Sequence, residues 1–269
     1  MIHDRTILHH WARPGSELPA PRALHRGAKQ TVPKWLACWA ALCLGQNAGA
    51  ADWAGFVAAS SDNVYHGLTQ NQGDAALTGD VHGRTAAGWF AGLAIATVNL
   101  NPGPGAPLEI AAYAGRSGPL SASTSGRLSV AHYAYPHDQS SLRYTYDELL
   151  ASLLWRDRLA ANVSYSPNTS RFSFRAINAR RPAWSAEVVL RQPVKPQWNL
   201  HAGLGHYSMS APIDQGYWYW NLTLAHSRGA WQFELAAIGT DSEARQLFGT
   251  QIAGQRLVFS VIRRFAKMD

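Results

Sequence analysis

The side chains able to do acid-base or metal chemistry are scattered along this sequence of 269 residues rather than gathered into a motif. His201 and His206 fall on opposite faces of one predicted strand, so they cannot bind one metal ion together. No G-x-S-x-G elbow, H-E-x-x-H pair, P-loop or helix-opening G-x-G-x-x-G occurs. We therefore predict no catalytic residue, no metal site and no cofactor. The other histidines after residue 50 are His66, His82, His132, His137 and His226.

A second set of polar residues has a regular placement, because its members share the minor, polar face of alternating segments. If those segments close into a barrel, this face lines the interior, here called the lumen. Charged rings of one sign in a lumen select ions of the other sign. The alternative is that Glu148, Arg158 and Glu234 pair across neighbouring strands and plug the interior. The predicted lumen residues are Asp62, His66, Glu109, Tyr113, Glu148, Arg158, Asn162, His201, Asn221 and Glu234.

The elements that would position these residues are strands, because apolar and polar residues alternate in segments that end in turn-forming residues. In residues 216–227, Trp218, Trp220 and Leu222 fall on one face, and Tyr217 and Asn221 fall on the other. Helical signatures are almost absent. The predicted strands cover residues 53–66, 75–84, 88–98, 108–115, 126–135, 143–154, 158–166, 183–191, 197–208, 216–227, 230–239 and 255–265.

This pattern fits either a soluble periplasmic β-sandwich with its apolar face inward or a membrane barrel with its apolar face outward. Two features favour the barrel. The strand at 255–265 carries a late Phe265, similar to the signal that the outer-membrane assembly machinery binds. Tryptophans gather at strand ends, where aromatic girdles meet the two membrane interfaces; they are Trp89, Trp155, Trp184, Trp198, Trp218 and Trp231. The predicted fold class is all-β, a transmembrane antiparallel barrel of about 12 strands (10–14).

Residues 1–50 form a separate leader in this prediction. An apolar stretch at 35–45 follows Lys34 and precedes small residues, as in a secretory signal with cleavage after Ala50. Eleven apolar residues are too few for a membrane-spanning helix. The basic, proline-rich segment 1–31 makes the region before the apolar stretch longer than in an ordinary signal peptide. An alternative prediction is that translation starts near Val32.

Composition narrows what the remaining segment, 51–269, can do. The leader holds both cysteines, which excludes a disulfide scaffold or a thiol enzyme for the rest. Removing the leader's six basic and two acidic residues from the totals of 24 and 17 leaves a net charge of only +3. We therefore predict no nucleic-acid partner.

Several short motifs resemble a known family in serial order. Residues 59–70 (ASSDNVYHGLTQ) resemble the opening segment of the TorF-type porin family of Gram-negative outer membranes, although His66 stands where that family usually has Arg. Residues 167–182, a predicted basic loop, are longer than the family's usual connection. Further matches are residues 88–94 (GWFAGLA), 112–115, 133–136, 146–149, 165–168, 203–207 and 239–241, and the strand ending at Phe265.

The resemblance implies an outer-membrane barrel with a channel role and supplies no catalytic residues. We hypothesise an outer-membrane channel for passive diffusion of small solutes. Its expected partners are outer-membrane lipid, lipopolysaccharide and the barrel assembly machinery. The alternatives are a sealed barrel with a structural or binding role, and a barrel-embedded hydrolase using His201 or His132.

Overall fold

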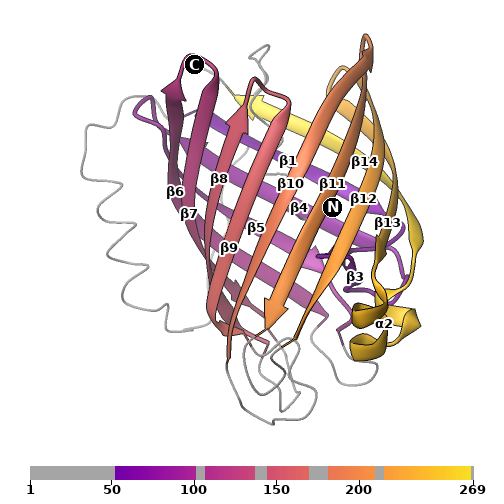
Figure 1. Cartoon of the computed structure of the whole chain (residues 1–269). Helices are drawn as coiled ribbons and strands as arrows, with labels where there is room; N and C mark the ends of the chain where they lie inside the picture. Colours follow the sequence, from indigo (N-terminus) through magenta and orange to yellow (C-terminus); the bar gives the residue numbers. More distant parts are fainter. Residues whose placement is uncertain (1–51, 101–106, 137–143, 170–180, 210–214, 268–269) are drawn as a thin grey trace.

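The protein folds into a closed barrel of twelve antiparallel strands (Figure 1). The computed structural model describes residues 52–100, 107–136, 144–169, 181–209 and 215–267. A two-stranded sheet, β2 (Val64–Tyr65) with β3 (Leu68–Thr69), is separate from the barrel wall. The barrel strands are β1 (Asp52–Ser60), β4 (Ala76–Arg84), β5 (Trp89–Thr97), β6 (Leu108–Ser121), β7 (Thr124–Ala134), β8 (Tyr146–Trp155), β9 (Leu159–Thr169), β10 (Arg181–Lys195), β11 (Trp198–Met209), β12 (Gln215–Arg228), β13 (Trp231–Thr240) and β14 (Arg256–Lys267).

Closure joins the first and last strands of the chain. β14 pairs with β13 on one side and with β1 on the other, in a register that sets Phe265 opposite Gly55. A Cβ atom on Gly55 would lie 2.6 Å from the Phe265 ring, so only glycine fits beneath it. With no free edge, every strand of the wall has a hydrogen-bonded neighbour on both sides.

The two ends of the barrel differ in their connections. At one end, uppermost in Figure 1, neighbouring strands are joined by short turns such as 156–158, 196–197 and 229–230; we call this the short-turn end. The opposite end, called the long-loop end, holds the longer connections 61–75 and 241–255. The latter contains the helices α2 (Ser242–Phe248) and α3 (Thr250–Ala253), with Asp241 capping α2 through the Ala244 amide at 2.9 Å.

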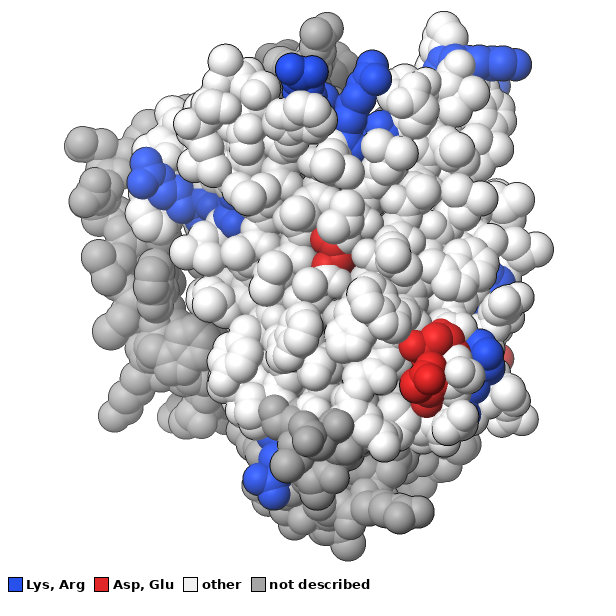
Figure 2. Space-filling view, viewed as in Figure 1, with Lys and Arg blue, Asp and Glu red and all other residues white. Residues whose placement is uncertain are grey.

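The outer face of the wall is apolar, as the alternation predicted. Along β12, Trp218 and Leu222 are exposed while Tyr217, Tyr219 and Asn221 are buried. Figure 2 shows a face almost free of charge between its two ends, with most Lys and Arg near the upper rim. The tryptophans lie at both ends, with Trp155, Trp198 and Trp231 near the short turns and Trp184 and Trp218 near the long loops. A continuous apolar belt between aromatic girdles suits a lipid environment.

No helix in the described parts of the chain is long and apolar enough to cross a membrane.

All twelve predicted wall strands are present, and three predictions need correction. Strand 53–66 was too long, because β1 ends at Ser60 and the chain then turns inward. Helices α2 and α3 were not predicted. The segment 167–182 is partly strand, since β9 continues to Thr169 and β10 begins at Arg181. Residues 170–180, like the predicted leader 1–50, lie outside the described residues.

Candidate functional site

The predicted lumen residues mostly occupy the inner face of the barrel. Asp62 and His66 lie in the connection 61–75 rather than on the strand that was expected to carry them. Arg158 was placed wrongly, because β9 begins at Leu159 and Arg158 is exposed in the turn before it. The residues on the inward face of a strand are Glu109, Tyr113, Glu148, Asn162, His201, Asn221 and Glu234.

The main feature of the lumen is the connection 61–75, here called the inward loop. It leaves β1 at the long-loop end and folds into the barrel, so that Val64 and Leu68 are 4% and 1% exposed. Val64 packs against Ile238 and Val258 on the inner wall. The Asn63 side-chain amide donates to the Thr97 carbonyl at the end of β5, 3.3 Å away. The loop therefore contacts wall strands on either side of β1.

A tight turn forms the tip of the inward loop. His66 and Gly67 separate β2 from β3, and both have positive φ, 47° and 79°. A two-residue hairpin turn of the I′ type needs positive φ at both positions, which glycine adopts without strain. A Cβ on Gly67 would lie 2.6 Å from the Thr240 methyl and 2.8 Å from the Tyr219 Cβ. Glycine is thus required both for the turn and for its close approach to the wall.

Aromatic side chains on the inner face of β11 and β12 pack against this hairpin. The His66 ring lies 4.9 Å from the ring of Tyr207 and 5.2 Å from that of Tyr219, centroid to centroid. Leu68 belongs to the same buried cluster as Tyr217, which is fully buried, and Phe248 of α2. The short helices therefore cover the hairpin from the long-loop end.

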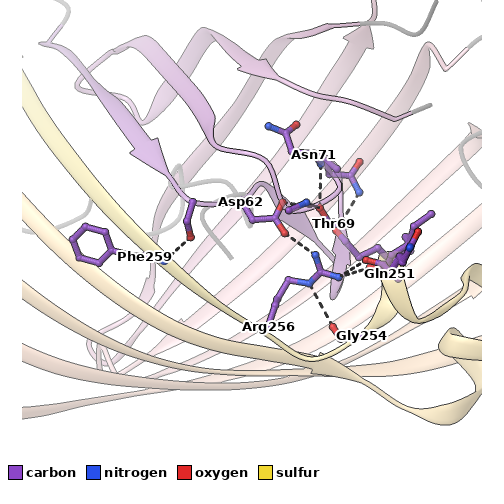
Figure 3. A network of polar contacts seen from close by, with 12 residues as sticks. Asp62, Thr69, Asn71, Gln251, Gly254, Arg256 and Phe259 are labelled. Carbon is purple, nitrogen blue, oxygen red and sulfur yellow. Dashed lines mark hydrogen bonds and ion pairs between the residues drawn. The ribbon is translucent and has the colours of Figure 1, made fainter. Parts of the chain in front are cut away.

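A polar network fixes the base of the inward loop (Figure 3). Arg256 Nη1 donates to Asp62 Oδ2 at 2.6 Å, with both side chains largely buried. The Thr69 hydroxyl donates to the other oxygen of Asp62, also at 2.6 Å. Arg256 Nη2 donates to the Gln251 and Ile252 carbonyls, at 3.0 and 2.9 Å. One arginine thus joins the inward loop, the helical connection and strand β14.

The hairpin also makes a hydrogen bond to the opposite wall. The Tyr65 hydroxyl donates to Glu148 Oε2 on β8, 2.8 Å away. Beneath this bond lies a cavity of about 50 Å³, with room for a few water molecules. Among the residues lining it are Tyr65, Tyr113, Arg127, Glu148, Asn162 and Ser164. The hairpin therefore narrows the lumen to a small space lined by both polar and apolar side chains.

Small polar side chains line the wall on the far side of this cavity, on strands β7 to β10. The Ser164 and Ser185 hydroxyls are 2.8 Å apart across the β9–β10 pair. Ser152 and Ser166 are buried from bulk solvent, and their hydroxyls have no hydrogen-bond partner in the described part of the chain. An apolar packed core would not place hydroxyls here, because an unpaired buried polar group is costly. This strip of wall is suited to water or a polar solute.

Several arginines on the inner face of the described strands were not predicted from the sequence: Arg84, Arg127, Arg191, Arg256 and Arg264. Their inward orientation could have been predicted from the alternation, since Arg191 shares its face with the buried Ser185 and Glu187 along β10. Arg127 likewise alternates with Ser129 on β7, and its guanidinium lies 4.0 Å from the centroid of the Phe90 ring.

The histidines considered for a hydrolase are separated by the wall. His201 faces the lumen, opposite Thr223 and Arg191 in the strand register. His132 faces outward, and its Nδ1 lies 2.7 Å from Asp147 Oδ1. In the described ranges, His132 and His201 therefore cannot belong to one site. Within those ranges, no group of three or more His, Cys, Asp or Glu residues could hold a metal ion.

Residues 46–265 match the model of a family of bacterial proteins of unknown function, Gcw_chp. The chain belongs to the Gcw_chp family. No curated protein matches this Gcw_chp sequence.

Solved structures similar to this Gcw_chp barrel are membrane proteins of low sequence identity. A structure from work on the in-meso crystallization of membrane proteins has a TM-score of 0.50 at 10% identity, covering 80% of this chain and 83% of its own. The KdgM porin has a TM-score of 0.49 at 9% identity, covering 80% and 99%. The NanC porin has a TM-score of 0.49 at 11% identity, covering 81% and 100%. The predicted barrel is confirmed, and the TorF-type assignment stays a prediction.

Proposed function

We propose that this protein is an outer-membrane channel through which small polar solutes diffuse passively, past the constriction that the inward loop forms. The observation that carries the proposal is the hydroxyl-lined wall of β7 to β10 facing the cavity beside the Tyr65–Glu148 hydrogen bond. The hydroxyls of Ser152 and Ser166 on this wall have no hydrogen-bond partner in the described part of the chain, so they are available to water or to a polar solute.

The outer face supports the membrane location. Exposed leucines such as Leu77, Leu153 and Leu257 lie between the tryptophan girdles, where lipid would cover them. Barrels of this type place short turns toward the periplasm and longer loops outside the cell, so the inward loop would enter from the cell surface. Lipid, lipopolysaccharide and the barrel assembly machinery are the partners expected for such a protein, and the TorF-type resemblance is in keeping with a channel. Its function requires no catalytic residue.

The test is conductance of residues 51–269 refolded into a planar lipid bilayer. Heat-modifiable mobility on a gel first establishes that the barrel is folded. We expect discrete current steps, small because the passage beside the hairpin is narrow. A folded barrel that gives no current step overturns the channel.

A second candidate, a sealed barrel, is favoured by the inward loop itself, because that loop occupies much of the lumen. A variant in which Val64–Thr69 is replaced by two glycines distinguishes the two candidate functions. A channel conducts before and after this change, whereas a sealed barrel conducts only after it.

A further inference from the structure

The charged side chains of the lumen are sorted by sign along the barrel axis. Arg84, Arg127, Arg191 and Arg264 face inward, each in the half of its strand nearer the short-turn end. An inward acid in that half is Glu234, which accepts a hydrogen bond from Gln232. Asp52 stands at the exposed mouth beside Arg84. Positive charge therefore predominates in this half of the lumen.

The half nearer the long loops has the opposite balance. Glu109, Glu148 and Glu187 face inward from β6, β8 and β10, and Asp62 lies in the inward loop. Of the described strand cations in that half, Arg256 forms an ion pair with Asp62, and Arg181 is exposed at the start of β10. Asp80, at the middle of β4, pairs with His82 at 2.7 Å and accepts from Tyr113 at 2.7 Å. Because Asp62 and Arg256 offset each other, Glu109, Glu148 and Glu187 make the balance negative among the described lumen residues of this half.

Strand β10 shows this polarity within one element. Glu187 and Arg191 share its inward face, and at about 3.3 Å per residue the four-residue step separates their Cα atoms by about 13 Å along the strand. Because the wall is of low dielectric, the field from such charges is concentrated in the lumen.

We propose that this polarised lumen selects small zwitterions, with the ammonium group toward the long-loop end and the carboxylate toward the short-turn end. This inference rests on the proposed channel function. A cation is repelled in the arginine half and an anion in the carboxylate half, whereas an oriented zwitterion is attracted along the whole path.

Aromatic rings on the carboxylate side add a second feature suited to an ammonium group. Tyr133 and Tyr146 stack at 4.5 Å between centroids on the inner wall. Tyr65 lies against Glu148. A cation over such a ring is attracted by its negative face. Carboxylates with tyrosine faces at one end and guanidinium groups at the other match the two ends of an amino-acid-like solute.

The test is the swelling rate of proteoliposomes in isosmotic glutamine, glutamate, lysine and sorbitol, which are zwitterion, anion, cation and neutral solute. We expect glutamine to enter several-fold faster than either charged amino acid. The double variant E187Q/R191Q, which weakens the polarity without changing net charge, should lose most of that preference while sorbitol entry is unchanged. R263Q is the matched control, because Arg263 faces outward over the Trp231 ring.

The outcomes separate the two proposals. Sorbitol entry with equal rates for the three amino acids overturns the zwitterion inference and leaves the channel standing. No swelling with any solute, from protein shown to be folded by heat-modifiable mobility, overturns the channel itself. If the double variant does not fold, E187Q and R191Q tested singly are each expected to lower the preference, and the wild-type rates alone are decisive.

Discussion

The two halves of the lumen are filled in different ways. Near the long loops, backbone fills it: the β2–β3 hairpin lies inside the barrel, covered by α2. Near the short turns, side chains of the wall fill it, including Phe90 and Arg127, with the arginine against the Phe90 ring. A barrel of about 8 strands is filled by side chains and one of 16 or more leaves an aqueous channel. Twelve strands fall between, so an extra segment of chain can narrow one half while the other needs none.

The largest expected effect comes from removing this difference between the halves. Replacing Val64–Thr69 by two glycines empties the long-loop half, so single-channel conductance in planar bilayers should rise several-fold. The barrel should still fold, because every wall strand keeps its two neighbours. A matched change at the other end, Gln197→Gly in the β10–β11 turn, should leave conductance as it was. Unchanged conductance in the deletion variant would show that the hairpin does not limit the passage.

The next effect concerns the anchor of the inward loop. Asp62→Ala leaves the largely buried Arg256 without its carboxylate, and breaking such a pair costs about 3–5 kcal/mol. We expect the low end, because Arg256 keeps its bonds to backbone carbonyls. Urea unfolding in detergent micelles measures the loss, and Asp62→Ala combined with Arg256→Ala should recover part of it. A double variant no more stable than the single one would argue against a coupled pair.

A smaller effect is expected from the bond that crosses the lumen. Tyr65→Phe removes one hydrogen bond to Glu148, worth about 1.5–3 kcal/mol when the acceptor is charged. The hairpin tip should then swing from the wall more often, seen as more frequent excursions to a higher conductance level. Tyr113→Phe loses a comparable bond to Asp80 within the wall and should not raise these excursions. If the two variants show equally frequent excursions, the Tyr65–Glu148 hydrogen bond does not hold the hairpin tip in place.

The smallest effect is expected midway between the halves. Ser164→Ala deprives Ser185 of its hydroxyl partner, at a net cost of about 1 kcal/mol. Conductance should barely change, because the substitution removes one oxygen from a wall that remains polar. A large fall in conductance would instead make this serine pair part of the narrowest point.

Much of the fold was predictable from local pattern. Period-two alternation marked all twelve wall strands, and it assigned Glu109, Tyr113 and Asn221 to the inner face. The prediction that Arg158 faces the lumen was wrong, because the alternation was extended to the residue before β9 begins. That residue lies in a turn, where alternation does not assign a side chain to a face. The inward arginines of β4, β7, β10 and β14 follow the same alternation but were not among the predicted lumen residues.

The inward loop was not predictable in this way. Val64 lies in a stretch that continues the alternation of β1, so the chain was predicted as strand as far as residue 66. Only contacts distant in sequence, such as Arg256 with Asp62 and Glu148 with Tyr65, distinguish an inward hairpin from a longer wall strand. The helices α2 and α3 are short, and packing over the hairpin holds them rather than a strong helical pattern of their own.

The sequence by itself determined a wall with two faces, because side chains alternate along a strand whatever lies around it. It therefore determined the strands and the two faces of each, whereas closure into a barrel is a property of the whole sheet. The tertiary structure alone decided what occupies the interior and how its charges are arranged, because strands far apart in the sequence bring Glu148, Arg191 and Arg256 into one lumen. Which solutes can pass depends on that shared space, and no single strand encodes it.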